Sequence, residues 1–308
     1  MPWRHFSISH QQSASLRLLD RVGSTMDAVR RELQRGRVAF DHFGQPRYIG
    51  VMAREQTAGR GQRGRLWFTP YNEALSVTYF LRHRFAEPQR ASRLALLVGA
   101  GVADSVRALL TESAAARNQQ ESAAISRESC ASDPDLPDIG LKWPNDILLN
   151  GRKLGGILIE MVKAPDGNWV ALVGIGLNLA VRAFPPELAS TAASLLLEAP
   201  FVPQIAPESM AVRIARAFPP LISLSRAQGF PALLERWRIY DRTPGRRYAT
   251  DIQGISTEGI AIGIDADGAL LLRFPDGRVQ AVSSASALRE SQHPALVSPA
   301  RSPDTAEG

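Results

Sequence analysis

The sequence is short of the residues that several functional classes need. Its 308 residues include one cysteine, Cys130, which excludes an internal disulfide framework and predicts a reducing compartment. The five histidines are scattered, and none pairs with another at the spacing of metal ligands. The sequence therefore predicts neither a disulfide scaffold nor a histidine-based metal centre.

Long apolar segments are also missing. We find no window as long as a membrane span, and the opening residues Met1-Pro2-Trp3-Arg4-His5 lack the apolar core of a signal peptide. These absences predict a cytoplasmic protein with no membrane partner. The hydrophobic content of 44% is enough for a large core and one small additional domain. A net charge of +6 permits phosphate or nucleic-acid partners without requiring them.

Apolar periodicity and turn residues predict the order of the main elements. Strands are expected over residues 16–19, 48–53, 75–81, 140–149, 153–162 and 170–178, and helices over 28–34, 93–110, 189–197, 207–224 and 230–240. This order predicts a mixed α and β domain.

Composition divides the chain further. Residues 111–137 are rich in Ala, Ser, Glu, Asn and Gln and almost lack large apolar side chains, so we expect a disordered insert there. Thr243-Pro244-Gly245 is typical of a boundary, which would end a main domain at residues 1–242. Residues 243–290 predict short antiparallel strands, and the polar residues 291–308 predict a disordered tail.

One seven-residue stretch combines glycine with positive charge: Gly59-Arg60-Gly61-Gln62-Arg63-Gly64-Arg65. Glycine lets the backbone approach a ligand closely, and free N–H groups with arginine forks form a cradle for anions. No Gly-Lys-Ser/Thr closes the stretch, so it is not a P-loop, and its spacing differs from the dinucleotide fingerprint. From these residues alone, a basic surface turn remains an equal alternative.

The dipeptide Asn150-Gly151 lies between two apolar runs and is the strongest short signal for a β-hairpin. With a two-residue loop, Asp146 is expected to face Gly155. Asp146 would then share a face with Lys153 as a diagonal neighbour, roughly 7–8 Å away. A carboxylate and an ammonium on one face, with glycine opposite, leave room for a ligand. The alternative is an ordinary ion pair on a surface hairpin.

Five motifs, in the same order, resemble those of biotin protein ligases, the enzymes that attach biotin to carboxylases. The motifs are Gly23–Met26, Gln56–Trp67, Lys142–Leu148, Arg152–Glu160 and Gly174–Asn178. The resemblance implies an α+β fold with a mixed sheet packed against helices, as in class II aminoacyl-tRNA synthetases and biotin ligases. It also implies a small C-terminal β-barrel of the Src-homology-3 type.

The same resemblance implies a two-step reaction. ATP activates biotin to biotinoyl-5'-AMP with release of pyrophosphate, and biotin then passes to a lysine of the biotin carboxyl carrier protein of acetyl-CoA carboxylase. The substrate carboxylate is itself the nucleophile, so no catalytic Ser, Cys or His is required. The protein must supply positioning and positive charge, and Mg²⁺ is the expected cofactor.

The resemblance also assigns roles to individual residues. It implies that the catalytic residues are Lys153, Arg60 and Arg65. The implied biotin-binding residues are Ser24, Thr25, Met26, Gln56, Arg60, Gly61, Gln62, Lys153 and Gly156. The implied ATP-binding residues are Arg60, Gln62, Arg65, Trp67, Lys142, Asn145, Asp146 and Asn178. Asp146 is also the expected anchor for Mg²⁺, a cation that typically uses one or two carboxylates together with phosphates. Taken alone, Ser24 and Thr25 are more simply a helix cap.

Two departures from the family pattern change the expectations. Many members carry Arg where this chain has Gln62, and Gln supplies no charge to retain the adenylate. Some members also carry an N-terminal winged-helix domain, but only about 20 residues precede the first motif here. We therefore expect no repressor role and no DNA partner, with either a monomer or a homodimer.

Two rival functions stay open on the sequence. A lipoate–protein ligase resembles this family in fold and adenylation chemistry, although the complete glycine–arginine stretch argues against it. A basic nucleic-acid-binding protein would interleave cations with aromatic residues. Aromatic residues are 7% of this chain, and its cations cluster near glycines instead.

Overall fold

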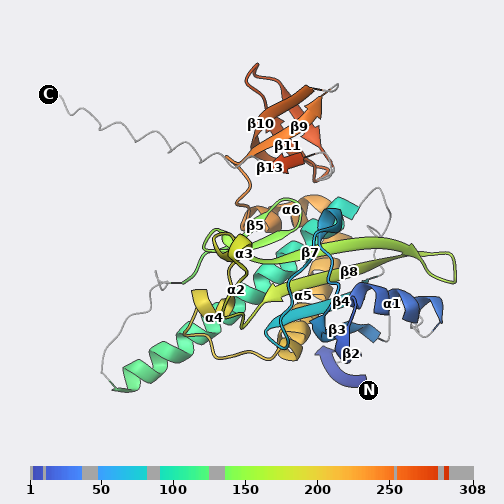
Figure 1. Ribbon diagram of the computed structural model, residues 1–308, viewed down its shortest axis with the longest axis vertical. Coiled ribbons are helices and arrows are strands. Elements are labelled where there is room, and N and C mark those ends of the chain that lie inside the picture. Colours follow the sequence, from blue (N-terminus) through green and yellow to red (C-terminus); the bar gives the residue numbers. More distant parts are fainter. Residues whose placement is uncertain are drawn as a thin grey trace. The chain divides into compact units, whose positions relative to one another are not determined.

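The computed structural model describes residues 3–9, 12–36, 48–81, 91–124, 136–252, 255–283 and 288–290. The chain divides into two compact units (Figure 1). The first comprises Met1–Arg242 with Ala266–Gly268, and the second comprises Thr243–Asp265 with Ala269–Gly308. The predicted tail at 291–308 lies outside the described residues.

An eight-stranded mixed sheet forms the first unit, which confirms the predicted fold class. Its strands are β1 (Trp3–Ser9), β2 (Gln12–Val22), β3 (Tyr48–Gln56), β4 (Ala74–Leu81), β5 (Ile139–Lys142), β6 (Asp146–Leu149), β7 (Arg152–Lys163) and β8 (Trp169–Asn178). The spatial order is β1-β2-β3-β4-β8-β7-β6-β5. The pair β2–β3 is parallel, and every other neighbouring pair is antiparallel.

Helices cover this sheet on both faces. They are α1 (Thr25–Gln34), α2 (Ala91–Ala124), α3 (Pro186–Ala189), α4 (Leu195–Glu198), α5 (Pro207–Gln228) and α6 (Phe230–Arg238), with a 3-10 turn η1 at Gln62–Gly64. The two faces can be followed on β4. Phe80 packs in the α1 cluster, while the hydroxyl of its neighbour Tyr79 donates to the Ala211 carbonyl on α5 at 2.7 Å. Successive strand residues point to opposite faces, so α1 and α5 lie on opposite sides of the sheet.

Strand β4 is more buried than its sequence indicates. Its alternation of apolar and polar residues predicts one solvent-exposed face, yet all eight residues of the strand are buried. The polar positions Ser76 and Thr78 are each 1% exposed. Their hydroxyls pair instead with Thr69 at 3.4 Å and Thr25 at 2.9 Å. The polar positions of β4 therefore face side chains brought from other elements rather than water.

Helix α2 corrects the prediction of a disordered insert from residue 111. The helix runs without a break from Ala91 to Ala124, so the expectation is wrong for residues 111–124. Leu110 and Ala114 are 2% and 3% exposed. Alanine, glutamate and glutamine are strong helix formers, and a helix begun on a buried face extends at low cost. Residues 125–135, with Cys130, lie outside the described residues.

The same helix corrects a second expectation. Among the described residues, Ala91–Gln119 is long and apolar enough to qualify as a membrane span, although we expected no such window. However, 78% of its apolar window is buried inside the protein. Helix α2 packs against β5, β6 and β7 and against α5 and α6. The apolar surface of α2 therefore forms part of the hydrophobic core of the first unit.

The second unit contains a small antiparallel sheet. Its strands are β9 (Arg247–Ile252), β10 (Ile255–Ile264), β11 (Leu270–Arg273), β12 (Val279–Val282) and β13 (Leu288–Glu290), in the order β12-β11-β10-β9-β13. Leu270 and Leu272 are fully buried. The turn between β11 and β12 uses Gly277 at φ 84°, a conformation in which glycine avoids the steric cost of a side chain.

We predict that Ala114→Asp destabilises the protein, because it places an unpaired carboxylate against the core. Burying a charge of this kind costs several kcal/mol, and each kcal/mol lowers the melting temperature by roughly 2–4 °C in a domain of this size. Ala116→Asp, on the exposed face of the same helix, is the matched control. Calorimetry of both variants gives the comparison. Equal melting temperatures would mean that α2 is not anchored beyond residue 110.

Candidate active site

Two consecutive hairpins build the centre of the site. The predicted turn at Asn150-Gly151 is confirmed, with Leu149 opposite Arg152. Trp143-Pro144 divides residues 140–149 into two strands, because Lys142 pairs with Asp146 across a turn that contains the cis Trp143–Pro144 bond. Strands β5, β6 and β7 therefore lie side by side at one end of the sheet.

A β-bulge changes the predicted register by one residue. Leu148 lies opposite Lys153, but Ile147 lies opposite Gly155, so Leu154 is the extra residue of β7. Asp146 consequently faces Gly156, and the predicted pairing of Asp146 with Gly155 is wrong. A Cβ on Gly156 would stand 3.7 Å from the ammonium of Lys153. Lys153 faces Leu148, two residues from Asp146, so the predicted shared face of Lys153 and Asp146 is kept despite the bulge.

Asp146 binds two ammonium groups at once. Its Oδ1 is 2.6 Å from Lys153 Nζ, and its Oδ2 is 3.0 Å from Lys142 Nζ. The carboxylate is 15% exposed, whereas the side chain of Lys153 is 40% exposed. Burial alone would raise the pKa of Asp146, but the charges and hydrogen bonds of the two lysines outweigh it and hold the pKa below its ordinary value. Asp146 thus holds the exposed ammonium of Lys153 at a largely buried carboxylate.

The expected Mg²⁺ anchor does not fit this arrangement. Both oxygens of Asp146 are already paired with lysines, and an ammonium at 2.6 Å occupies the position that a cation would take. Within the residues that the structure describes, no group of three or more metal-ligating side chains exists. In this arrangement Asp146 places Lys142 and Lys153.

The backbone of Lys153 is held on both edges. On one side it pairs with β6, and on the other its N–H donates to the Thr191 carbonyl at 2.7 Å, while its carbonyl accepts from the Ala193 N–H at 2.8 Å. The side chain of Asn178 donates to the Ala193 carbonyl at 2.9 Å. Residues 191–193 carry no motif, so sequence reasoning missed them. Their contribution is made through backbone groups that any residue possesses.

Trp67 lies against the glycines of β8. A Cβ added to Gly176 would stand 2.4 Å from Trp67 Cε2, so a side chain there would displace the indole. The ammonium of Lys153 lies 5.9 Å from the Trp67 ring centroid. The Trp67 Nε1–H is buried and has no partner among the described residues. The structure thereby brings Trp67, Lys153 and Gly176 together from a loop and two strands.

A second group of predicted residues gathers at the start of α1. Gln56 Oε1 accepts hydrogen bonds from the N–H and the hydroxyl of Thr25, at 2.8 and 3.0 Å. The Thr25 hydroxyl also lies 2.9 Å from that of Thr78, a residue that the motifs did not indicate. Ser24 is buried and occupies the N-cap position without a side-chain cap hydrogen bond, which does not support simple capping. Met26 packs in the hydrophobic core beneath α1.

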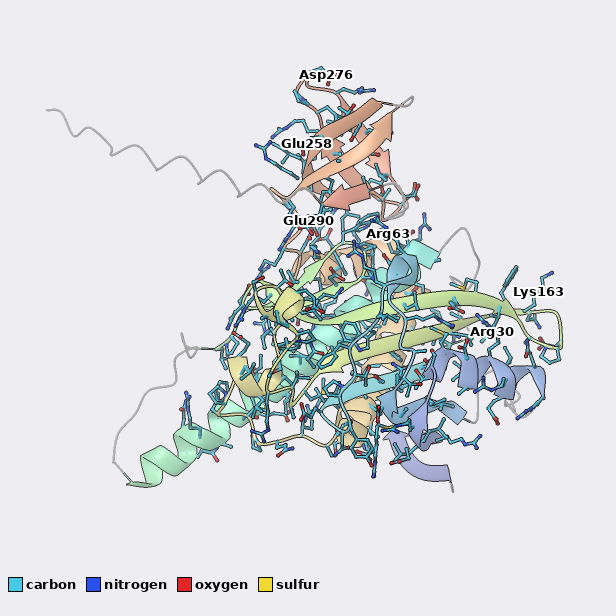
Figure 2. All side chains as sticks on the ribbon, in the orientation of Figure 1. Arg30, Arg63, Lys163, Glu258, Asp276 and Glu290 are labelled. Atoms are coloured by element: carbon cyan, nitrogen blue, oxygen red, sulfur yellow. The ribbon has the colours of Figure 1, made fainter. Side chains whose placement is uncertain are left out.

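The glycine–arginine stretch folds back on itself. The Gly61 N–H donates to the Arg65 carbonyl at 2.7 Å, and the Trp67 N–H donates to the Gly59 carbonyl at 2.9 Å. Arg63 adopts φ 59°, in the left-handed region that non-glycine residues rarely occupy. We call residues 59–65 the Gly-Arg loop, in which Figure 2 labels Arg63.

The cations of the Gly-Arg loop differ in their surroundings. Arg60 donates from both guanidinium ends to Asp27, at 2.7 and 3.0 Å, and these hydrogen bonds raise its pKa. Arg65 is exposed, and the described residues give its side chain no hydrogen bond or ion pair. Asn145, also expected near a nucleotide, donates its amide to the Ile157 carbonyl at 2.7 Å. Arg60 and Asn145 therefore have structural partners, and Arg65 presents its charge to solvent.

Comparison with known proteins gives this geometry a family. The model described as biotin/lipoate A/B protein ligase family matches residues 32–179, and the biotin protein ligase C terminal domain matches residues 250–288. The biotin–[acetyl-CoA-carboxylase] ligase of Paracoccus denitrificans is 32% identical over 232 residues, which cover 74% of this chain and 85% of the relative. The chain belongs to the biotin protein ligase family.

Other biotin protein ligases match over different shares of their length. The biotin–[acetyl-CoA-carboxylase] ligase of Mycobacterium tuberculosis is 31% identical, over 77% of each chain. The bifunctional ligase/repressor BirA of Escherichia coli is 29% identical over 221 residues, or 72% of this chain. The match spans about 60% of the length of BirA.

Solved structures of biotin protein ligases share the fold. The Aquifex aeolicus enzyme in complex with biotin and ATP superposes with a TM-score of 0.66 at 20% identity, covering 90% of this chain and 99% of that one. The Leishmania major enzyme in complex with biotinyl-5-AMP has a TM-score of 0.52 at 27% identity, covering 87% and 98%.

We predict a pH dependence for the contribution of Asp146 to stability. Its folded pKa lies below the unfolded value of about 3.9. The contribution is therefore complete above that pH and disappears as the pH falls through the folded pKa. Urea unfolding of wild type and Asp146→Asn between about pH 7 and pH 3 measures it. The difference in unfolding free energy should shrink at the acid end, and a pH-independent difference would contradict the assigned ion pairs.

Proposed function

We propose that this protein joins biotin to a lysine of a biotin carboxyl carrier protein, in two steps that use one molecule of ATP. The observation that carries the proposal is the Lys153 ammonium, anchored on Asp146 beside Trp67 and still 40% exposed. Family membership supports the choice of biotin, and the Aquifex aeolicus relative was solved in complex with biotin and ATP.

In the first step, a biotin carboxylate oxygen attacks the α-phosphorus of ATP. The bond from that phosphorus to the bridging oxygen breaks, and pyrophosphate leaves with the electron pair. Both reactants are anionic, so the barrier falls when fixed positive charge faces them. Lys142, Lys153 and Asp146 together carry two positive charges and one negative charge, which leaves one positive charge for the substrates. Arg65 supplies a second cation from the Gly-Arg loop.

In the second step, the amine of the acceptor lysine attacks the carbonyl carbon of the biotinoyl-adenylate. An amide bond forms, the bond from that carbon to the phosphate oxygen breaks, and AMP leaves. The amine loses a proton in the process. Lys153 stays beside the same carboxyl group in both steps, because its backbone is fixed by β6 and by residues 191–193.

The opposite end of biotin is proposed to lie at the turn Gly23–Thr25. Its half-buried neighbour Gln56 is fixed through Oε1, and the Nε2 amide makes no hydrogen bond to the described residues. An amide donor beside a buried hydroxyl suits a polar ring of the ureido type. The carrier of acetyl-CoA carboxylase is the proposed acceptor, because two relatives are named for it, and the single cysteine supports a cytoplasmic setting.

The test is incubation with ATP, Mg²⁺, labelled biotin and a biotin carboxyl carrier domain. Label should appear on the carrier in an ATP-dependent way, and pyrophosphate should be released with biotin alone. Labelled lipoate with a lipoyl domain is run in parallel, because the matching family model includes lipoate ligases. Transfer of lipoate without transfer of biotin would overturn the proposal.

We predict that Lys153→Gln lowers the rate of adenylate formation by about two to three orders of magnitude, because charge aimed at the transition state is lost. Lys163→Gln is the matched control, since Lys163 is also on β7 and also lies over an indole, that of Trp169, at 5.5 Å. Figure 2 labels this lysine at the far end of β7. Pyrophosphate release measures both. A wild-type rate in Lys153→Gln would remove it from the mechanism.

We predict that Gln62→Arg slows the escape of biotinoyl-adenylate about tenfold, because it adds one charge-assisted hydrogen bond at the low end of its usual value. Gln62 opens the η1 turn, and the neighbouring Arg60 is committed to Asp27. Stopped-flow release of the adenylate measures the effect, and stray labelling of non-cognate lysines should fall in parallel. Equal or faster release from the Arg variant would show that Gln62 only shapes the loop.

A further inference from the structure

The ion pair between Asp27 and Arg60 joins two parts of the proposed biotin site. Asp27 lies in the first turn of α1, three residues after Ser24. Arg60 is the first arginine of the Gly-Arg loop. The guanidinium forms a two-point fork with the carboxylate, at 2.7 and 3.0 Å. Such forks fix direction as well as distance, because a planar donor pair meets a planar acceptor pair.

Two further charges complete the arrangement. Glu160 Oε1 on β7 lies 3.8 Å from Arg60 Nη2, and the other oxygen of Glu160 pairs with Arg30. Arg30 Nη1 is 3.6 Å from Asp27 Oδ1. Two cations and two anions therefore alternate, and their formal charges cancel. We call Asp27, Arg30, Arg60 and Glu160 the charge ring; Figure 2 labels Arg30 on α1.

The charge ring acts where the backbone contacts of the loop end. The N–H groups of Thr57 and Ala58 donate to the carbonyls of Val22 and Gly23, at 2.9 and 2.8 Å, and tie the strand end to the α1 turn. From residue 60 to residue 66, the backbone pairings of the described residues stay inside the loop. Beyond Ala58, the Arg60 side chain connects the loop to α1.

We propose that Asp27 is a positioning residue that holds the Gly-Arg loop over the Gly23–Thr25 turn through its fork with Arg60. The inference rests on the proposed function, because it concerns the biotin end of the same site. Arg60 then increases biotin affinity by positioning the loop backbone. Its guanidinium pairs with Asp27 and Glu160 rather than with a phosphate. This replaces the role of phosphate ligand that the motif alone implies for Arg60.

The two roles for Arg60 predict opposite behaviour of Asp27. If Asp27 positions the loop, Asp27→Asn and Arg60→Gln each break the same fork and weaken biotin binding alike. A misplacement of the loop by about 1 Å is expected to lower biotin affinity by about ten- to a hundredfold. If Arg60 binds phosphate, Asp27 competes for it, and Asp27→Asn improves the use of ATP while Arg60→Gln impairs it.

The experiment measures biotin affinity by calorimetry and the KM for biotin and for ATP in the pyrophosphate assay. Asp27→Asn, Arg60→Gln and their double variant should share one raised Kd for biotin, with the KM for ATP within about twofold of wild type. A purely structural defect would not separate biotin from ATP in this way.

Glu112→Gln provides the matched control. Glu112 on α2 and Arg213 on α5 form the same two-point fork, at 2.7 and 2.9 Å, between two helices away from the site. This variant should leave both KM values unchanged. The inference is overturned if Asp27→Asn retains wild-type biotin affinity, or if it lowers the KM for ATP while Arg60→Gln raises it. Wild-type protein that fails to bind biotin would instead overturn the proposed function itself.

Discussion

The placement of Lys153 by the buried carboxylate of Asp146 is the interaction on which the rest of the site depends. A lysine head on four rotatable carbons has no direction of its own. Contact with Asp146 at 2.6 Å supplies one, and Lys142 on the second oxygen prevents the carboxylate from turning away. The carboxylate is 15% exposed, so the cost of its desolvation offsets part of the attraction to the lysines. We infer that this pair is retained for geometry rather than for the stability of the fold.

The hairpin was predictable and its register was not, for a physical reason. Asn150-Gly151 determines its turn through local backbone preferences, which the sequence displays directly. The bulge at Leu154 depends on partners on both edges of β7, with β6 on one edge and β8 together with residues 191–193 on the other. Such partners are distant in sequence and contribute through the backbone. No pattern in residues 140–163 records them.

Composition gave the wrong prediction for residues 111–124, where helix propensity and burial of one face act together. Residues 111–124 have the polar content of a disordered segment, yet they extend a helix whose buried half ends at Ala114. The motifs named Thr25, Gln56, Trp67 and Lys153, and the structure brings Thr25 to Gln56 and Lys153 to Trp67. They gave no role to Asp27, Thr78 or Glu160, because these residues act on other residues of the motifs through tertiary contacts.

The parallel pairing of β2 with β3 has a consequence for the order in which the site can form. Gln56 is the last residue of β3, and Thr25 begins α1 shortly after β2. The contacts between Thr25 and Gln56 therefore come from the early part of the chain. The other end needs β7, β8 and then residues 191–193, which hold Lys153 from its outer edge. Domains generally fold as units while synthesis proceeds. Both ends of the site belong to one compact unit, so the site is complete only after residues 191–193 have been synthesised and have joined β7.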